Sequence, residues 1–411
     1  MKIEREIKME QKKTFFQKVK AAGPAAVITS AFIGPGTITT STIAGANFGY
    51  ALLWSVVFSG FSLIVIMNMA SRLGIGGRKN IIEGATDLLP NSNVWKMFIA
   101  LFIAVAIGLT ALGFEAGNII GATTGLSDIL GIEVWLAGLV IGILSAAAIW
   151  FSTPSIIELI MKAFVALMGI IFLVTAIIVG PDLGALFAGF IPSVPDGSLV
   201  TTVALIGTTI IGINLVFHSI AATDKWDKES DIEDSKFDTN LNVSLGVVMT
   251  LAVIITTSAV LFGTGTEVNS PIVYAQALEP VLGTWARSFA ALGLVLAGLS
   301  SAIATPYMTG VIFGKVFNWK SDSINPKLIA MVAVVFGTIL AMQGQRPTQI
   351  IVFAQATSGV FLPFISLLFV LAANSKKLGK FKNTTTQNVL GFISFAVTFF
   401  LGMWTLYNLF F

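Results

Sequence analysis

The sequence predicts an all-α polytopic membrane protein of about eleven transmembrane helices, arranged as two inverted five-helix repeats with the first and sixth helices broken. Three observations predict this class. The 411 residues are 55% hydrophobic and only 11% charged, whereas soluble domains carry about 25% charged residues. Apolar segments of about 20 residues, enough to span a bilayer, follow one another along the chain. Two of these segments are interrupted by residues that unwind a helix.

The apolar segments are separated by loops that are too short to hold a soluble domain. We therefore expect residues 1–22 to form a cytoplasmic tail and residues 23–411 to form one transmembrane domain, with repeats at about 23–181 and 198–373. The predicted spans lie at 25–48, 51–71, 97–120, 134–151, 156–180, 199–222, 241–264, 287–314, 327–343, 349–373 and 387–410.

Lysine and arginine gather in alternate loops. The alternate loops at 72–96, 152–155, 223–240, 315–326 and 374–386 together hold thirteen of them, and the loops on the other side hold almost none beyond Arg346 and, at a helix start, Arg287. Basic residues accumulate on the cytoplasmic side of membrane proteins. We expect a multi-pass protein of the cell membrane, with its N-terminus inside and its C-terminus outside.

Composition excludes several functions. The chain has no cysteine and one histidine, His218, so thiolate and multi-histidine metal sites are absent. No HExxH, GxSxG or Walker motif is present, so we do not expect an enzyme or a cofactor. The pI near 9.0 reflects loop lysines and does not indicate nucleic acid. The expected partners are the bilayer and a small-molecule or ion substrate, and a monomer is the expected state.

The first span is interrupted by Gly34-Pro35-Gly36-Thr37, and the sixth around Thr208-Thr209 and Gly212-Ile213-Asn214. Unwound backbone at membrane depth is tolerated only where it is buried or lines a cavity. Broken helices at matching positions of two inverted halves mark the substrate site of a transporter. The sequence therefore predicts a transport site where the two breaks meet.

Four segments resemble one family. "GPGTITTSTIAGANFGYALLW" (34–54) resembles the first-helix DPGN segment of the Nramp family of divalent-metal/proton symporters. "ASRLGIGGRKNIIEGA" (70–85) resembles its link from the second to the third helix. "IGTTIIGINLVFHS" (206–219) is similar to its sixth-helix motif, MPHN before L-x-x-H-S, and "VFAQATSGVFLPF" (352–364) to its tenth helix. The resemblance implies the LeuT-type fold of two inverted five-helix repeats.

The resemblance also implies where a metal would bind, and this chain departs from it there. The family binds its metal through the Asp and Asn of DPGN, a sixth-helix carbonyl and the Met of MPHN. Those positions are Gly34, Thr37, Thr208 and Ile211 here, while Asn214 retains the Asn of MPHN. No metal site with the family's usual ligands is expected. The substrate-site residues implied are Gly34, Gly36, Thr37, Thr208, Ile211, Asn214 and Gln355.

Two readings of the cargo follow. Hard divalent ions need oxygen ligands, normally with a carboxylate, and a pocket without fixed charge leaves a double charge unneutralised. Helix N-termini attract anions, and the hydroxyls of Thr37 and Thr39 are expected to add donors. The favoured reading is therefore secondary active transport, ion- or proton-coupled, of a small organic acid or amino-acid-like solute. The alternative is a divalent cation, Mg²⁺ or Mn²⁺, carried through a rebuilt site.

Three residues are candidates for coupling to an ion or proton. Glu115 lies deep in the third span, where a carboxyl group is a functional hypothesis by default. Asn118 follows three residues later, at a position of the family's proton route. His218 lies four residues after Asn214 and could relay protons or serve as a structural imidazole. Ser300 is expected, like Ser301, only to allow close helix packing.

Overall fold

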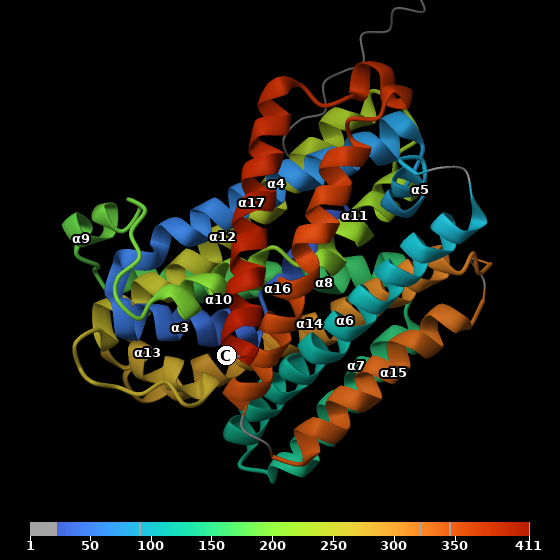
Figure 1. Cartoon of the computed structure of the whole chain (residues 1–411). Coiled ribbons are helices and arrows are strands. Elements are labelled where there is room, and N and C mark those ends of the chain that lie inside the picture. The colour runs from blue at the N-terminus through green and yellow to red at the C-terminus, as the bar shows by residue number, and fades with distance from the viewer. Residues whose placement is uncertain (1–22, 90–91, 321–322, 345–346, 411) are drawn as a thin grey trace, which may run out of the picture.

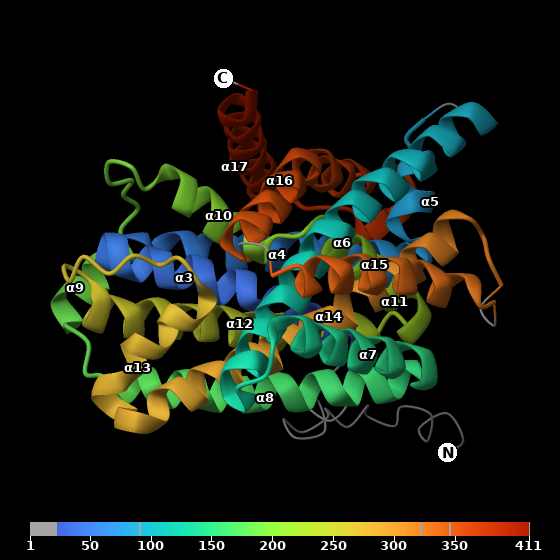
Figure 2. The same ribbon diagram turned by 90° about the horizontal axis from the view of Figure 1, so that it is seen from below.

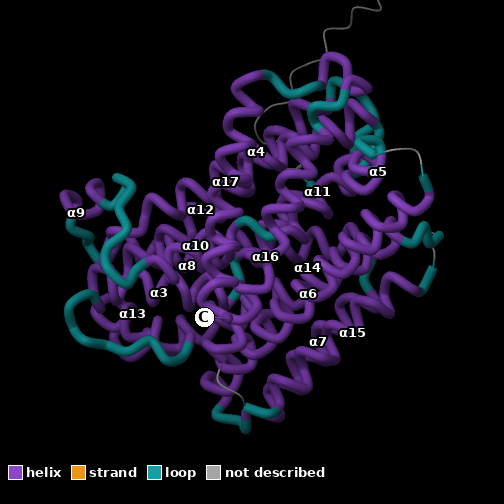
Figure 3. The backbone as a smooth tube through the Cα atoms, viewed as in Figure 1, coloured by secondary structure: helices purple, strands orange, loops and turns teal. Residues whose placement is uncertain are grey.

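The computed structural model describes residues 23–89, 92–320, 323–344 and 347–410. All regular structure within these ranges is helical, and they contain no strand, as Figure 3 shows. This confirms the predicted all-α class. The predicted tail, residues 1–22, lies outside the described residues.

The first half of the chain begins with a broken helix. Two segments, α2 (Pro24–Phe32) and α3 (Pro35–Phe48), together occupy the first predicted span. The following elements are η1 (Gly49–Leu52), α4 (Leu53–Ser71), η2 (Arg72–Gly76), α5 (Ile81–Thr86), α6 (Asn93–Leu130), α7 (Val134–Phe151), α8 (Pro154–Ile178) and α9 (Leu183–Ala188).

The second half begins in the same way. Two segments, α10 (Leu199–Thr209) and α11 (Gly212–Lys225), occupy the sixth predicted span. The following elements are α12 (Asp231–Leu261), η3 (Pro271–Val273), α13 (Tyr274–Leu282), η4 (Gly283–Trp285), α14 (Ala286–Val316), α15 (Asn325–Met342), α16 (Pro347–Ala372), η5 (Lys376–Phe381) and α17 (Thr385–Phe410).

All eleven predicted spans correspond to apolar helices. Within the described residues, nine helical stretches are long and apolar enough to cross a membrane. One of them, Pro35–Gly76, covers the part of the first predicted span that follows the break and the whole of the second span. A shorter apolar helix, Ser358–Ala372, supplies the tenth span. The protein is therefore a multi-pass membrane protein, as its composition predicts.

The first break begins one residue before the position that the sequence suggested, and the second lies between the two positions that it suggested. The first lies at Ile33 and Gly34, because Pro35 already starts α3, where a proline without an N–H costs nothing. The second lies at Ile210 and Ile211, which are both extended, and α11 starts at Gly212. β-branched residues favour such extended backbone, so the two isoleucines separate α10 from α11 between the threonines and the glycine that the sequence pointed to.

Helix contacts follow the pattern of an inverted repeat. In each half the segment before the break packs on the last helix of the half, α2 on α8 and α10 on α16. The segment after each break packs on the second helix of the other half, α3 on α12 and α11 on α4. Corresponding helices also meet across the halves, α6 with α14 and α7 with α15. In Figures 1 and 2, α9 and α13 lie at one end of the molecule and α5 lies at the other.

The long helices α6 and α14 form the most extensive contact, and small residues let their backbones approach. A Cβ atom at Gly298 of α14 would lie only 2.6 Å from the backbone nitrogen of Ala122 on α6. Helix pairs in membranes associate through such small residues. This contact holds the polar residues of both helices beside the first break.

Candidate functional site

The first break has its carbonyl groups satisfied from within the protein. The Ser301 hydroxyl of α14 donates to the carbonyl oxygens of Ser30, at 2.8 Å, and Ala31, at 3.2 Å. The Thr37 hydroxyl donates to the carbonyl of Phe32. The last carbonyls of α2 would otherwise lack partners, as they do at any helix C-terminus. Hydroxyl groups therefore stabilise the break.

At the second break, the nearby threonine hydroxyls do not bond to the last carbonyl oxygens of α10. The Thr208 and Thr209 hydroxyls both turn back to the carbonyl of Leu205, at 2.9 and 3.3 Å. The carbonyls of Gly207, Thr208 and Thr209 accept no backbone hydrogen bond from outside the helix within the described part of the chain. A helix C-terminus also carries a partial negative charge. These oxygens are suited to a cation, and the Thr208 carbonyl is the one that the resemblance implied.

Gly34 faces the polar side chains of α6 and α14. A Cβ atom at Gly34 would lie 2.9 Å from Ser301 Oγ and 3.0 Å from Asn118 Oδ1. The Asn118 amide also donates to Thr305 Oγ1 at 3.4 Å. The structure thus brings together two residues that the sequence assigned to separate roles, Gly34 at the substrate and Asn118 on a coupling route.

Glu115 lies one turn before Asn118 on α6 and is completely buried. Apart from an interaction with the Asn118 side chain, its carboxyl oxygens have no hydrogen-bond partner among the described residues. Buried polar groups in proteins are nearly always hydrogen-bonded. Glu115 therefore remains the candidate for the coupling role that the sequence suggests.

Asn214 is a second exception, in the first turn of α11. It is 1% exposed, and neither its amide nitrogen nor its amide oxygen has a partner among the described residues. One turn later, His218 is buried, and its Nε2 lies 2.8 Å from Ser71 Oγ and 3.3 Å from Thr239 Oγ1. These contacts join α11 to α4 and α12, as a structural imidazole would. Of these two residues, Asn214 is the one whose side chain has no described hydrogen-bond partner.

The other predicted site residues are placed as follows. Gly36 and Thr37 lie in the first turn of α3, and Ile211 is the N-cap of α11. Gln355 lies in α16, but its side chain is outside the described residues. The Thr37 and Thr39 hydroxyls, which the sequence suggests as donors to the site, both donate to backbone carbonyls in this structure.

Sequence reasoning missed the part played by Ser301. The sequence predicts only close packing for Ser300 and Ser301, because small residues are common at membrane helix contacts. The available signal was the spacing of Ser301 and Thr305, which places two hydroxyls on one helix face. The described residues contain no group of three or more His, Cys, Asp or Glu side chains that could hold a metal ion.

Comparison with known proteins identifies the family. The profile described as "Natural resistance-associated macrophage protein-like", Nramp, matches residues 25–408. This chain belongs to the Nramp family. A divalent metal cation transporter MntH of Yersinia pestis (strain Pestoides F) is 28% identical over 402 residues, covering 95% of this chain and 96% of the relative. An MntH of Deinococcus radiodurans is 24% identical, covering 94% and 89%.

Solved structures share the fold. The Eremococcus coleocola manganese transporter, in complex with an aromatic bis-isothiourea substituted compound, matches with a TM-score of 0.79 at 21% identity, covering 96% of this chain and 87% of that one. MhsT in complex with L-phenylalanine matches with a TM-score of 0.65 at 15% identity, covering 92% and 98%. This Nramp protein therefore has the predicted LeuT-type fold and belongs to a family of transporters, not enzymes.

Proposed function

We propose that this Nramp protein is a secondary transporter that carries a divalent metal cation through a site built from oxygen ligands. The observation that carries the proposal is the likeness, over nearly the whole chain, to divalent metal cation transporters. This likeness favours a divalent cation as the cargo. The sequence alone had favoured an organic acid. Support from the site comes from the last carbonyl oxygens of α10 and the buried carboxyl of Glu115.

The ligand types indicate which cations suit the site. Gly34 and Ile211 offer neither a carboxylate nor a thioether, and thioethers favour soft ions. Oxygen from carbonyls, hydroxyls and amides suits Mg²⁺ and Mn²⁺, and Mg²⁺ usually keeps several of its waters. A partly hydrated ion spreads its charge over more ligands, which lowers the cost of having only Glu115 to balance it. We therefore propose Mg²⁺ or Mn²⁺, moved by alternating access with Glu115 in the coupling route.

A small carboxylate is the second candidate. It is supported by the unpartnered Asn214 amide in the first turn of α11, because a helix N-terminus and an amide both donate to anions. Gly34 removes the acidic side chain that would repel such a solute. The two candidates predict opposite results in one assay.

The test is uptake by proteoliposomes that contain the purified chain under an imposed pH gradient. We expect saturable uptake of Mg²⁺ or Mn²⁺ and no uptake of radiolabelled amino acids or small carboxylates. Empty liposomes and liposomes without a pH gradient are the controls. Saturable carboxylate uptake without cation uptake would reject the proposed cargo in favour of the second candidate.

Replacing Gly34 by aspartate gives a sharper test of the site. The new Cβ would lie 2.9 Å from Ser301 Oγ, 3.0 Å from Asn118 Oδ1 and 3.4 Å from Ser301 Cβ, so both side chains must shift slightly to admit it. An added carboxylate supplies negative charge beside the proposed cation, so it should tighten Mn²⁺ binding at least about tenfold. A tenfold change corresponds to about 1.4 kcal/mol of binding free energy. Mn²⁺ affinity would be measured by calorimetry for Gly34→Asp and for the uncharged control Gly34→Asn. Equal Mn²⁺ affinities in the two variants would mean that position 34 does not face the cargo.

A further inference from the structure

A basic pocket lies away from the helix breaks, at the end of the molecule predicted to be cytoplasmic. It has a volume of about 510 Å³, within the range of small-molecule sites. The link between α4 and α6, the start of α6 and η5 all contribute to it. Its lining residues are Arg78, Lys79, Glu83, Thr86, Asp87, Leu89, Lys96 and Lys377.

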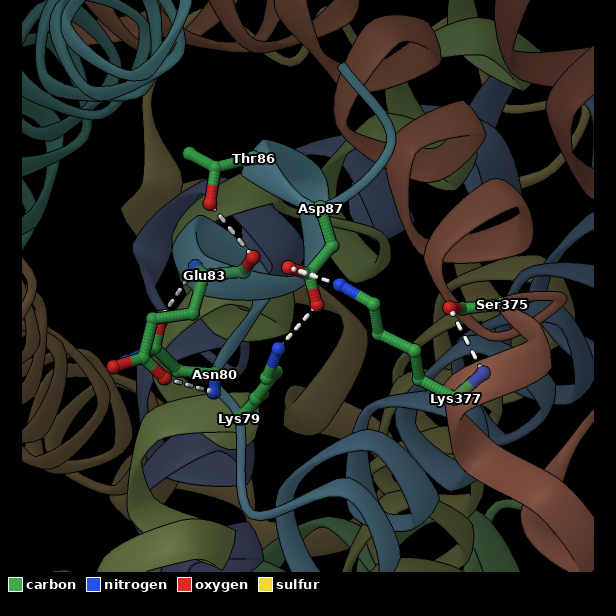
Figure 4. Close-up of polar contacts among 7 residues, drawn as sticks. All are labelled: Lys79, Asn80, Glu83, Thr86, Asp87, Ser375 and Lys377. Carbon is green, nitrogen blue, oxygen red and sulfur yellow. Dashed lines mark hydrogen bonds and ion pairs between the residues drawn. The ribbon is translucent and has the colours of Figure 1, made fainter. Parts of the chain in front are cut away.

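The charges of the pocket do not balance. Four basic side chains face two carboxylates, so the lining carries a net charge of +2. Figure 4 shows Lys79 and Lys377 converging on Asp87 from two sides, and Lys377 Nζ lies 2.9 Å from Asp87 Oδ1. Glu83 is engaged in a capping box with Asn80 at the start of α5. Neither carboxylate is therefore left to pair with a further cation.

Two basic residues remain available to a ligand. Lys96 makes no side-chain hydrogen bond or ion pair that the structure describes, and it is exposed in the first turn of α6. Arg78 uses Nη1 to donate to the Trp226 carbonyl at 2.7 Å, which leaves most of its guanidinium free. Lysine and arginine together are the usual recognition set for phosphate.

Asp87 is ionised and pairs with two of the lysine side chains that line the pocket. Burial acts to raise the pKa of its carboxyl, but hydrogen bonds and charge from Lys79 and Lys377 outweigh burial and hold that pKa below its ordinary value. Asp87 is therefore ionised at neutral pH, and its ion pairs are lost only when the pH falls below the ordinary range of a carboxyl group. It offsets part of the basic charge and fixes the two lysine side chains.

The surroundings of the pocket suit a lipid. Beside Lys96, the exposed side chains of Trp95 and Phe98 pack edge to face, with ring centroids 6.0 Å apart. Aromatic residues of this kind gather at the level of the lipid headgroups. A basic pocket between membrane helices at that level is a site for anionic headgroups.

We propose that this pocket binds a phosphate-bearing anion, supplied by the headgroup of an anionic phospholipid. The phosphate lies between Lys96 and Arg78, and the acyl chains extend past Trp95 and Phe98. A bound headgroup would join the start of α6 to the link that follows α4 and so stabilise the cytoplasmic ends of the second and third spans. The inference does not depend on which cargo the protein carries.

The experiment measures lipid retention by the full chain in nanodiscs of phosphatidylcholine with or without phosphatidylglycerol, followed by native mass spectrometry. We expect phosphatidylglycerol to be retained and Lys96→Gln to weaken its retention about fivefold, the factor that one basic residue contributes at an anionic surface. Lys228→Gln, which removes an exposed lysine on the same predicted side, is the matched control. Asp87→Asn raises the lining charge and should strengthen retention.

A second arm distinguishes the source of the phosphate. Inorganic phosphate and glycerol 3-phosphate are added in detergent, and the midpoint of thermal unfolding is followed for the same variants. In one outcome these solutes stabilise the unaltered chain, Lys96→Gln loses that stabilisation, and phosphatidylglycerol is not selectively retained. That outcome would support the phosphate site and overturn the lipid as the source of the phosphate. Equal behaviour of Lys96→Gln, Lys228→Gln and the unaltered chain in both arms would overturn the proposal.

Discussion

Glu115→Gln is expected to abolish the dependence of uptake on an imposed pH gradient. Glutamine has nearly the shape of glutamate but cannot take up or release a proton, so the packing of α6 should be retained. Glu115 is completely buried, and apart from an interaction with the Asn118 side chain it has no described partner. An intramembrane carboxyl group of this kind is expected to exchange protons or to neutralise a cargo. We expect initial uptake in proteoliposomes to fall by about a hundredfold or more, the scale on which positioned proton-transfer groups act.

The matched control is Glu133→Gln. Glu133 is exposed at the N-cap of α7, so this variant removes the same charge outside the apolar core and should transport normally. The midpoint of thermal unfolding should be little changed in Glu115→Gln, which separates loss of coupling from loss of folding. Full pH-dependent uptake by Glu115→Gln would show that the buried carboxyl is structural.

Sequence alone predicted most of the fold for a simple physical reason. In lipid, only helices and closed barrels satisfy the backbone, so runs of about 20 apolar residues can be read directly as spans. The breaks were also readable, because Gly34-Pro35-Gly36 does not continue a helix. Their exact positions were not, since β-branched residues such as Ile210 and Ile211 favour extended backbone but also occur throughout the helical spans.

The site was predicted less completely because its geometry depends on contacts between distant segments. The sequence identified Gly34 and Asn118 separately, but only folding places the Asn118 amide oxygen 3.0 Å from a Cβ atom at Gly34. Whether a hydroxyl group is free is equally invisible in a sequence. Ser301 and Thr37 are both engaged by carbonyls of α2, whereas Asn214 is left without a described partner.

The close contact of α6 with α14 explains how these distant segments are held together. Ala122 lies one turn after Asn118, and Gly298 lies almost one turn before Ser301. The approach of Gly298 to the Ala122 backbone therefore sets the separation of Asn118 and Ser301, the two side chains that face Gly34. A change at Gly298 should affect both the stability of the protein and the geometry of the first break.

Gly298→Ala is accordingly expected to be strongly destabilising. The added Cβ would lie 2.6 Å from the backbone nitrogen and 2.8 Å from the Cα atom of Ala122, so the two helices must separate. Overpacking of this kind costs about 1–3 kcal/mol, and alanine regains roughly 1 kcal/mol over glycine within a helix, so we expect a net loss of up to about 2 kcal/mol. We expect a lower midpoint of thermal unfolding in detergent, measured by circular dichroism, and reduced uptake.

Gly293→Ala on the same helix is the control. Its Cβ would make ordinary contact with the Phe172 ring at 3.5 Å, so only the helix preference for alanine should act and the midpoint should stay the same or rise. Each variant adds one methyl group to α14. The two variants differ only in where that group lies and in which atoms it contacts. If both variants unfolded at the same temperature, α6 and α14 would not approach as closely as described, and the separation of Asn118 and Ser301 would need another explanation.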